Sequence, residues 1–100
     1  MIQNFQTYEL AVQLHRQCEK IRAKAYMKDQ LLRASLSIVL NLAEGSAKPT
    51  PLEQRRFYAI AFGSVRETQA LLDLHGNEQA KALAHRIGGM VYRLVHPRPS

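Results

Sequence analysis

The side chains best suited to catalysis or metal binding are four histidines and one cysteine, and their spacing favours neither role. No two of His15, His75, His85 and His96 stand four residues apart, the spacing that places two ligands on one helix face. Cys18 is the single cysteine and falls on an apolar stripe, so we expect a small core residue and not a nucleophile. We therefore expect no metal, no cofactor and no enzymatic activity.

Positive charge is the second chemically active feature of the chain. The sequence holds 14 Lys and Arg against 8 Asp and Glu, a net charge of +6. Arg16, Lys20 and Lys24 recur every four residues and would form one ridge on the outer face of a helix. Basic residues of the last helix would lie near this ridge if the first and last helices are adjacent: Lys81, Arg86 and Arg93.

These six basic residues are our candidate nucleic-acid contacts. Lys and Arg that neutralise phosphates bind RNA or DNA with little regard to sequence. Base stacking has little support, because the chain has no Trp and only Tyr26 and Tyr92 stand near basic residues of the first and last helices. The alternative interpretation is that the basic residues form ordinary solvated helix faces.

A narrow polar stripe and a wide apolar arc share residues 31–44. At about 100° per residue, Arg33, Ser37, Asn41 and Glu44 fall on the stripe, and apolar residues fill about 200° of the remainder. That arc is twice as wide as a surface helix needs. Either the rest of the bundle surrounds this helix or, as we favour, a second subunit covers part of it. The predicted oligomer-interface residues are Arg33, Leu36, Val39, Asn41 and Glu44.

Glu44 also lies in the last turn of its helix, where the helix dipole disfavours an anion. A nearby cation would offset this, and the candidates are Lys48, Arg55 and Arg56 of the same chain or Arg33 of a neighbouring subunit. Exposure of Glu44 to water is the alternative.

The elements that must position these residues are helices. The four prolines lie at 49, 51, 97 and 99, outside every periodic segment, and no alternating strand pattern is found. Thr50-Pro51 and Asn77 are helix-start signals, and Gly45 and Gly76 are good residues for ending helices. We predict an all-α, up-down-up-down antiparallel bundle over residues 1–96, with helices at about 7–25, 29–45, 51–75 and 78–95 and a flexible tail at 97–100.

Membrane and export signals are missing from the sequence. No apolar run approaches the roughly 20 residues that span a bilayer, and no charged start followed by an apolar run resembles a secretion signal. We therefore expect no membrane partner and a cytoplasmic location.

The run from Arg33 to Gly45, with its ordered Ser-Ile-x-x-Asn-x-Ala-Glu-Gly core, resembles the hallmark of one family. These are the four-helix-bundle proteins encoded in intervening sequences of 23S ribosomal RNA genes. Phe5, the segment 8–14 and the residues Phe57, Ile60, Ala61, Gly63, Ser64 and Glu67 look like the family's first and third helices. The resemblance implies a closed homo-oligomer, typically a pentameric ring.

The family that the chain resembles is also similar to the accessory proteins of diversity-generating retroelements. That similarity implies a basic pentamer that binds nucleic acid and a reverse transcriptase. Our first hypothesis is thus a non-enzymatic oligomeric scaffold that binds RNA or DNA through the first and last helices. The alternative is an adaptor for a protein such as a reverse transcriptase, without a direct nucleic-acid role.

Overall fold

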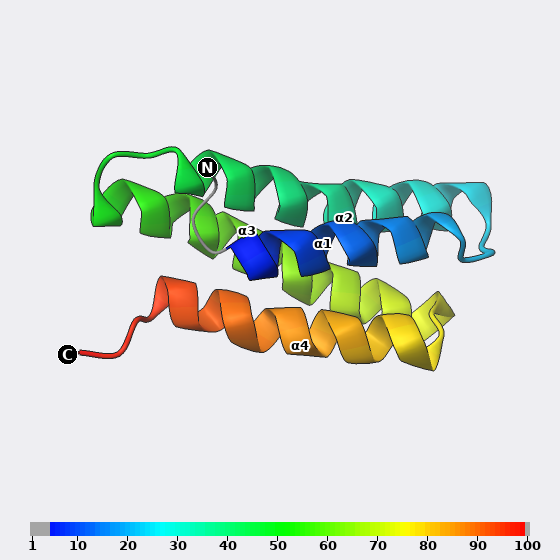
Figure 1. The fold of residues 1–100 in the computed structure, drawn as a ribbon. Coiled ribbons are helices and arrows are strands. Elements are labelled where there is room, and N and C mark those ends of the chain that lie inside the picture. Colours follow the sequence, from blue (N-terminus) through cyan, green and yellow to red (C-terminus); the bar gives the residue numbers. More distant parts are fainter. Residues whose placement is uncertain (1–4, 100) are drawn as a thin grey trace.

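A computed structural model describes residues 5–99 as four helices (Figure 1): α1 Phe5–Glu19, α2 Ala25–Ser46, α3 Pro51–His75 and α4 Glu78–Val95. Within these residues there is no strand, so the all-α prediction of four helices is confirmed. Each helix packs against the next, and α1 also packs against α4. In Figure 1 the α1–α2 and α3–α4 connections lie at one end of the molecule, and the α2–α3 connection lies at the other. Residues 1–4 of the expected bundle and Ser100 of the expected tail lie outside the described residues.

The boundary between the first two helices differs from the prediction. The first helix was expected to continue to residue 25 and the second to begin at 29, but α1 ends at Glu19 and α2 begins at Ala25. Lys28 is the physical reason, because its Nζ donates to the backbone oxygens of Glu19, at 2.6 Å, and of Ile21. A cation at these otherwise unpaired carbonyls stabilises the end of α1.

The starts of α3 and α4 follow from local capping. The Thr50 hydroxyl accepts from the Glu53 amide at 3.2 Å, ahead of Pro51 in the first turn. The Asn77 side-chain oxygen accepts from the Ala80 amide at 2.7 Å. Both residues adopt the extended backbone that an N-cap requires, so each helix begins where its own sequence satisfies the first free amides.

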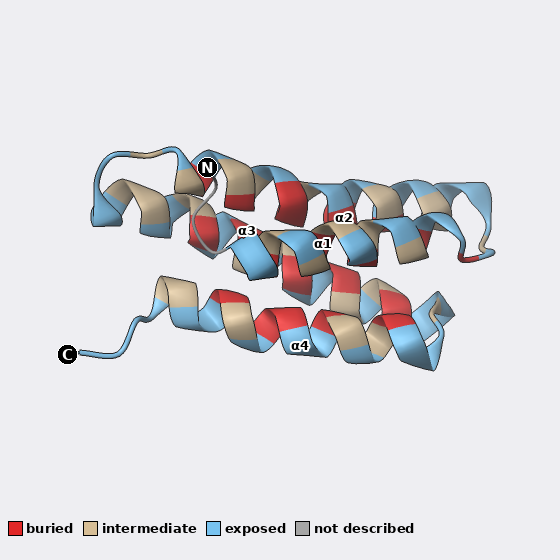
Figure 2. Ribbon diagram, in the orientation of Figure 1, coloured by how far each residue is buried: buried red, intermediate tan, exposed pale blue. Residues whose placement is uncertain are grey.

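The core lies along the axis shared by the four helices. Figure 2 shows the buried residues of α4 on the edge that faces the other helices. The large, fully buried side chains come from every helix and include Leu14, Ile38, Leu72 and Ile87. Such an apolar stripe on each helix is what holds a four-helix bundle together.

Candidate functional site

The predicted polar stripe of α2 lies at its seam with α3. Arg33 pairs with Glu67 at 3.2 Å, and the Ser37 and Ser64 hydroxyls lie 2.7 Å apart. Asn41 turns back along its own helix, where its Nδ2 donates to the Ser37 carbonyl at 2.9 Å. Two of the predicted interface residues, Arg33 and Asn41, therefore make contacts within the chain.

Glu44 pairs with Lys48 at 3.3 Å, one of the four cations that the sequence left open. The Lys48 ammonium also lies 5.0 Å from the centre of the Phe57 ring. The pair is partly exposed, so its contribution to stability is small, on the order of 0–1 kcal/mol. Its effect is to place a cation beside the last turn of α2, where the helix dipole disfavours an unpaired carboxylate.

Gly45, the last residue of the hallmark run, allows α2 to approach a tyrosine of α3. A Cβ placed on Gly45 would lie 2.7 Å from Cε1 of Tyr58, far inside van der Waals contact. Tyr58 is 4% exposed and belongs to the core. The glycine is therefore required by packing within this chain. It does not end the helix as predicted, because α2 continues through it to Ser46 and Ala47 is the C-cap.

The wide apolar arc of α2 divides into a buried side and an exposed side. Val39, a predicted interface residue, is 8% exposed and lies in the core of its own bundle, so its expected place on an outer interface is corrected. Leu36 and Leu40 are 41% and 57% exposed. Ile60 of α3 is 53% exposed, and the Ser37–Ser64 and Gly45–Tyr58 contacts place it about level with Leu40. We call Leu36, Leu40 and Ile60 the apolar face.

Gly63 lies within α3, between Ile60 and Glu67, and is exposed. A Cβ added there would meet no atom within 4 Å. A glycine inside a helix costs about 1 kcal/mol relative to alanine, and no packing among residues 5–99 accounts for it. The sequence pattern favoured a close-packing role for Gly63, and none is found among the described residues.

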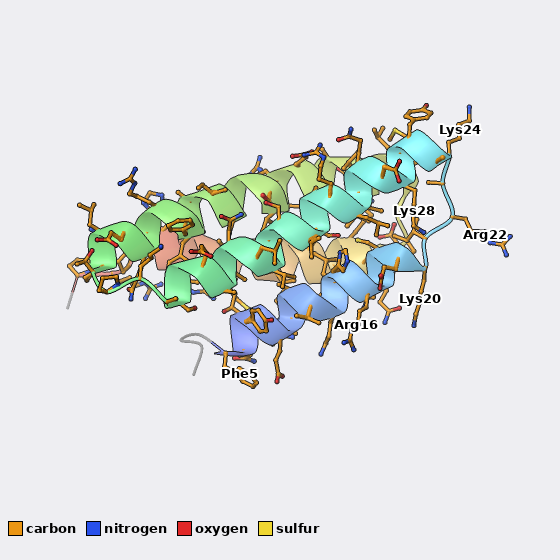
Figure 3. The ribbon with its side chains drawn as sticks, turned by 90° about the horizontal axis from the view of Figure 1, so that it is seen from above. Phe5, Arg16, Lys20, Arg22, Lys24 and Lys28 are labelled. Carbon is orange, nitrogen blue, oxygen red and sulfur yellow. The ribbon has the colours of Figure 1, made fainter. Side chains whose placement is uncertain are left out.

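The predicted basic ridge of Arg16, Lys20 and Lys24 is not continuous, because α1 ends before the second of them. Figure 3 shows Arg16 and Lys20 pointing the same way, Arg22 pointing off the end of the bundle and Lys24 lying apart from them at the start of α2. All four side chains are exposed. The ion pairs found among residues 5–99 include none of them. We call Arg16, Lys20, Arg22 and Lys24 the basic end cluster.

Arg22 has no place in the predicted ridge, because that ridge assumes one continuous helix through residue 24. In a continuous helix Arg22 would lie away from the ridge, whereas the residue 20–24 connection brings it to the end of the bundle together with Lys20. The density of basic residues from 16 to 28 was the available signal. Lys28 also belongs to this run, but its ammonium donates to the backbone carbonyls at the end of α1.

The predicted basic residues of α4 have different environments. Lys81 lies 3.8 Å from Asp73 and 3.7 Å from Glu78, so its charge is compensated. Arg86 and Arg93 are exposed and lie beside the α1–α4 seam, where Arg86 shares a groove with Gln13 and Gln17. Helices α1 and α4 are adjacent, as expected. Glutamines, however, line the groove between the basic residues of α1 and those of α4.

Two of the candidate chemical groups, Cys18 and His15, meet at the side chain of Ser35. Burial raises the pKa of the Cys18 thiol, against the opposing effects of a Ser35 hydrogen bond and the Lys28 charge. His15 also contacts Ser35, with Nδ1 2.8 Å from the hydroxyl oxygen. Among residues 5–99, no three His, Cys, Asp or Glu side chains gather closely enough to hold a metal ion. None of the helices described is long and apolar enough to cross a membrane.

Comparison with known proteins places the chain in one family. The sequence profile of one family, described as 23S rRNA-intervening sequence protein, matches residues 3–85. The match includes α1, α2, α3 and the first part of α4, and leaves Arg86, Arg93 and the tail outside it. No curated protein matches the chain. Because the profile covers most of the sequence, including the hallmark run and the α2–α3 seam, the chain belongs to the family of 23S rRNA-intervening sequence proteins.

Proposed function

We propose that this chain is a non-enzymatic subunit of a ring-shaped homo-oligomer, most simply a pentamer of up-down-up-down bundles, that binds RNA or DNA without sequence preference. The basic end cluster carries the proposal. Arg16, Lys20 and Arg22 stand in the last turn of α1 and the connection after it, and Lys24 lies apart from them at the start of α2. All four cations are exposed, and no described ion pair occupies them. Phosphates are the ligands that such a cluster attracts most strongly.

The apolar face supports assembly. The exposed fractions of Leu36, Leu40 and Ile60 add up to about one and a half whole side chains. Full burial of such a side chain contributes about 1.5–3 kcal/mol, so covering this face would contribute roughly 2–4 kcal/mol for each subunit. Gly63, open to solvent in the middle of α3, would let a neighbouring subunit approach closely.

Assembly would strengthen phosphate binding. Each chain carries +6, so five copies would carry +30. Repeating the basic end cluster around a ring would place several weak phosphate sites on one particle, and linked sites bind far more tightly than single ones. The cytoplasmic location stays a prediction.

A charge on the apolar face tests the assembly. Leu40→Glu is expected to release monomers in sedimentation velocity, because a carboxylate buried in the interface costs several kcal/mol. The single chain should stay helical by circular dichroism, since Leu40 is exposed in it and Glu is a good helix former. Leu74→Glu is the matched control, at a leucine that is 70% exposed near the far end of α3. An unchanged sedimentation coefficient for Leu40→Glu would contradict the interface.

Paired arginine substitutions test the nucleic-acid role. Arg16→Gln with Arg22→Gln is expected to weaken RNA binding and to reduce the slope of log affinity against log salt by roughly 1–2, since each lost phosphate contact removes about 0.7–0.9. Arg55→Gln with Arg56→Gln removes the same charge from exposed sites on α3 and should change the slope less. Equal effects of the two pairs would show that only net charge matters, and no binding at low salt would refute the proposed function.

The adaptor alternative rests on the same apolar face. A protein partner, such as a reverse transcriptase, would cover Leu36, Leu40 and Ile60 in place of a second copy. A partner that stays bound after nuclease treatment and in high salt, on a chain that sediments as a monomer, would favour this alternative.

A further inference from the structure

A hollow lies between α3 and α4. Phe62, Arg66 and Gln69 line it from α3, and His85, Gly89 and Tyr92 line it from α4. These positions are spaced three, four or seven residues apart on each helix, so each helix contributes one face. A second hollow, which shares Gln69 and His85, continues it towards Lys81 and Asp73.

Aromatic rings form one wall of this hollow. The Phe62 and Tyr92 rings meet edge to face, with centroids 5.8 Å apart. The His96 ring, just after α4, lies 4.6 Å from Tyr92. Phe62 is partly buried against the core, whereas Tyr92 is 51% exposed. The contacts with Phe62 and His96 hold the Tyr92 ring in place while it remains open to solvent.

The charges and the floor of the hollow suit an anionic ligand with flat groups. Its lining contains the Arg66 guanidinium and the His85 imidazole and no carboxylate. The one carboxylate of the adjoining hollow, Asp73, pairs with Lys81. Two glycines of α4 also line the hollow, the buried Gly88 and the exposed Gly89. A Cβ on Gly89 would meet only the Arg93 guanidinium, at 3.8 Å, so this side of the hollow is open.

We infer that this groove binds the unpaired bases of a single-stranded nucleic acid, with one base stacked on Tyr92 and Arg66 contacting a phosphate. The inference rests on the proposed function and names its ligand class and a second contact site. Exposed aromatic rings beside cations are how proteins hold single strands without reading sequence, whereas the bases of a duplex are stacked and closed to such a ring.

The test uses a fluorescently labelled oligothymidylate of about 12 residues and a duplex of the same length, titrated with the full chain at low salt. Tyr92→Ala is expected to weaken single-strand binding by about 5-fold to 100-fold and to leave duplex binding unchanged. Tyr92→Phe keeps the ring and should bind the single strand as the unaltered chain does. Tyr26→Ala is the matched control, at a tyrosine that is 64% exposed at the start of α2 and outside the hollow, and should weaken single-strand binding much less than Tyr92→Ala does.

Two further measurements keep the inference testable if Tyr92→Ala fails to fold. Gly89→Leu fills the hollow without removing a ring and should also weaken single-strand binding. Stacking should quench tyrosine emission in the unaltered chain, and this quenching should be lost in Tyr92→Phe. Unchanged single-strand binding by Tyr92→Ala and Gly89→Leu, or an equal loss in Tyr26→Ala, would overturn the inference while leaving the proposed function intact. Binding of neither probe by the unaltered chain would instead refute the proposed function.

Discussion

Replacing Gly45 with alanine tests whether the hallmark glycine is present for packing against Tyr58. The new Cβ would lie 2.7 Å from Cε1 and 2.9 Å from Cδ1 of the ring, and 3.2 Å from the Gln54 carbonyl oxygen. Carbon atoms in contact normally lie about 3.5–4.0 Å apart, so the ring or the helix would have to move by about 0.8 Å. Tyr58 is 4% exposed and has core side chains around it, so neither movement is easy.

The cost follows from two opposing effects. Forcing an extra methyl group into a packed core costs about 1–3 kcal/mol. Exchanging glycine for alanine in a helix returns up to about 1 kcal/mol, and less at Gly45, which is next to the last residue of α2. We expect a net loss of about 1–2 kcal/mol in the free energy of unfolding, which lowers the melting temperature of a chain of this size by about 4–15 °C.

Thermal unfolding followed by circular dichroism, at one fixed protein concentration, measures this loss. Gly89→Ala is the matched control, because a Cβ there has an ordinary 3.8 Å contact and should not destabilise the helix. Combining Gly45→Ala with Tyr58→Leu should recover part of the loss through a coupling of about 0.5–3 kcal/mol. An unchanged or higher melting temperature for Gly45→Ala would refute the packing argument.

Two further substitutions test the end of α1 and the open glycine of α3. Lys28→Met removes the donor to the Glu19 and Ile21 carbonyls, so urea unfolding should show a loss of about 1–3 kcal/mol; an unchanged midpoint would mean that Lys28 does not end α1. Gly63→Ala, made in the Leu40→Glu background, should raise the melting temperature by several degrees, since the added methyl has open space. A fall in melting temperature would contradict the open space at Gly63. In the otherwise unaltered chain, Gly63→Ala should weaken the oligomer, because the methyl group would stand where a neighbouring subunit approaches.

The parts of the fold that the sequence predicted correctly depend on local signals. Thr50 and Asn77 cap the helices that they precede, and each accepts from the amide three residues further along the chain. The starts of α3 and α4 can therefore be predicted from a few neighbouring residues. The connection between α1 and α2 has no such signal, because residues 20–24 contain no glycine or proline that would predict the end of a helix. The end of α1 depends instead on a lysine of the next helix, a tertiary contact without a local signature.

The candidate sites, too, were predictable where they depend on local sequence and not where they depend on contacts between helices. Periodicity identified an arc on α2 that was too apolar, but it could not say that Val39 faces inward while Leu40 faces solvent, because that depends on where α1 and α3 pack. The hollow between α3 and α4 could not be predicted from the sequence, because Phe62 and Tyr92 are far apart in the chain and meet only when α3 packs against α4. The Ser37–Ser64 contact was hidden for the same reason.

Native mass spectrometry at low salt, with and without a short single-stranded RNA, tests the central claim most directly. The chain has a mass of 11.4 kDa. The account predicts a closed oligomer, with a mass of about 57 kDa for five copies, and a further species heavier by the mass of the bound RNA. A single species at 11.4 kDa, unchanged when RNA is added, would contradict both the assembly and the nucleic-acid role.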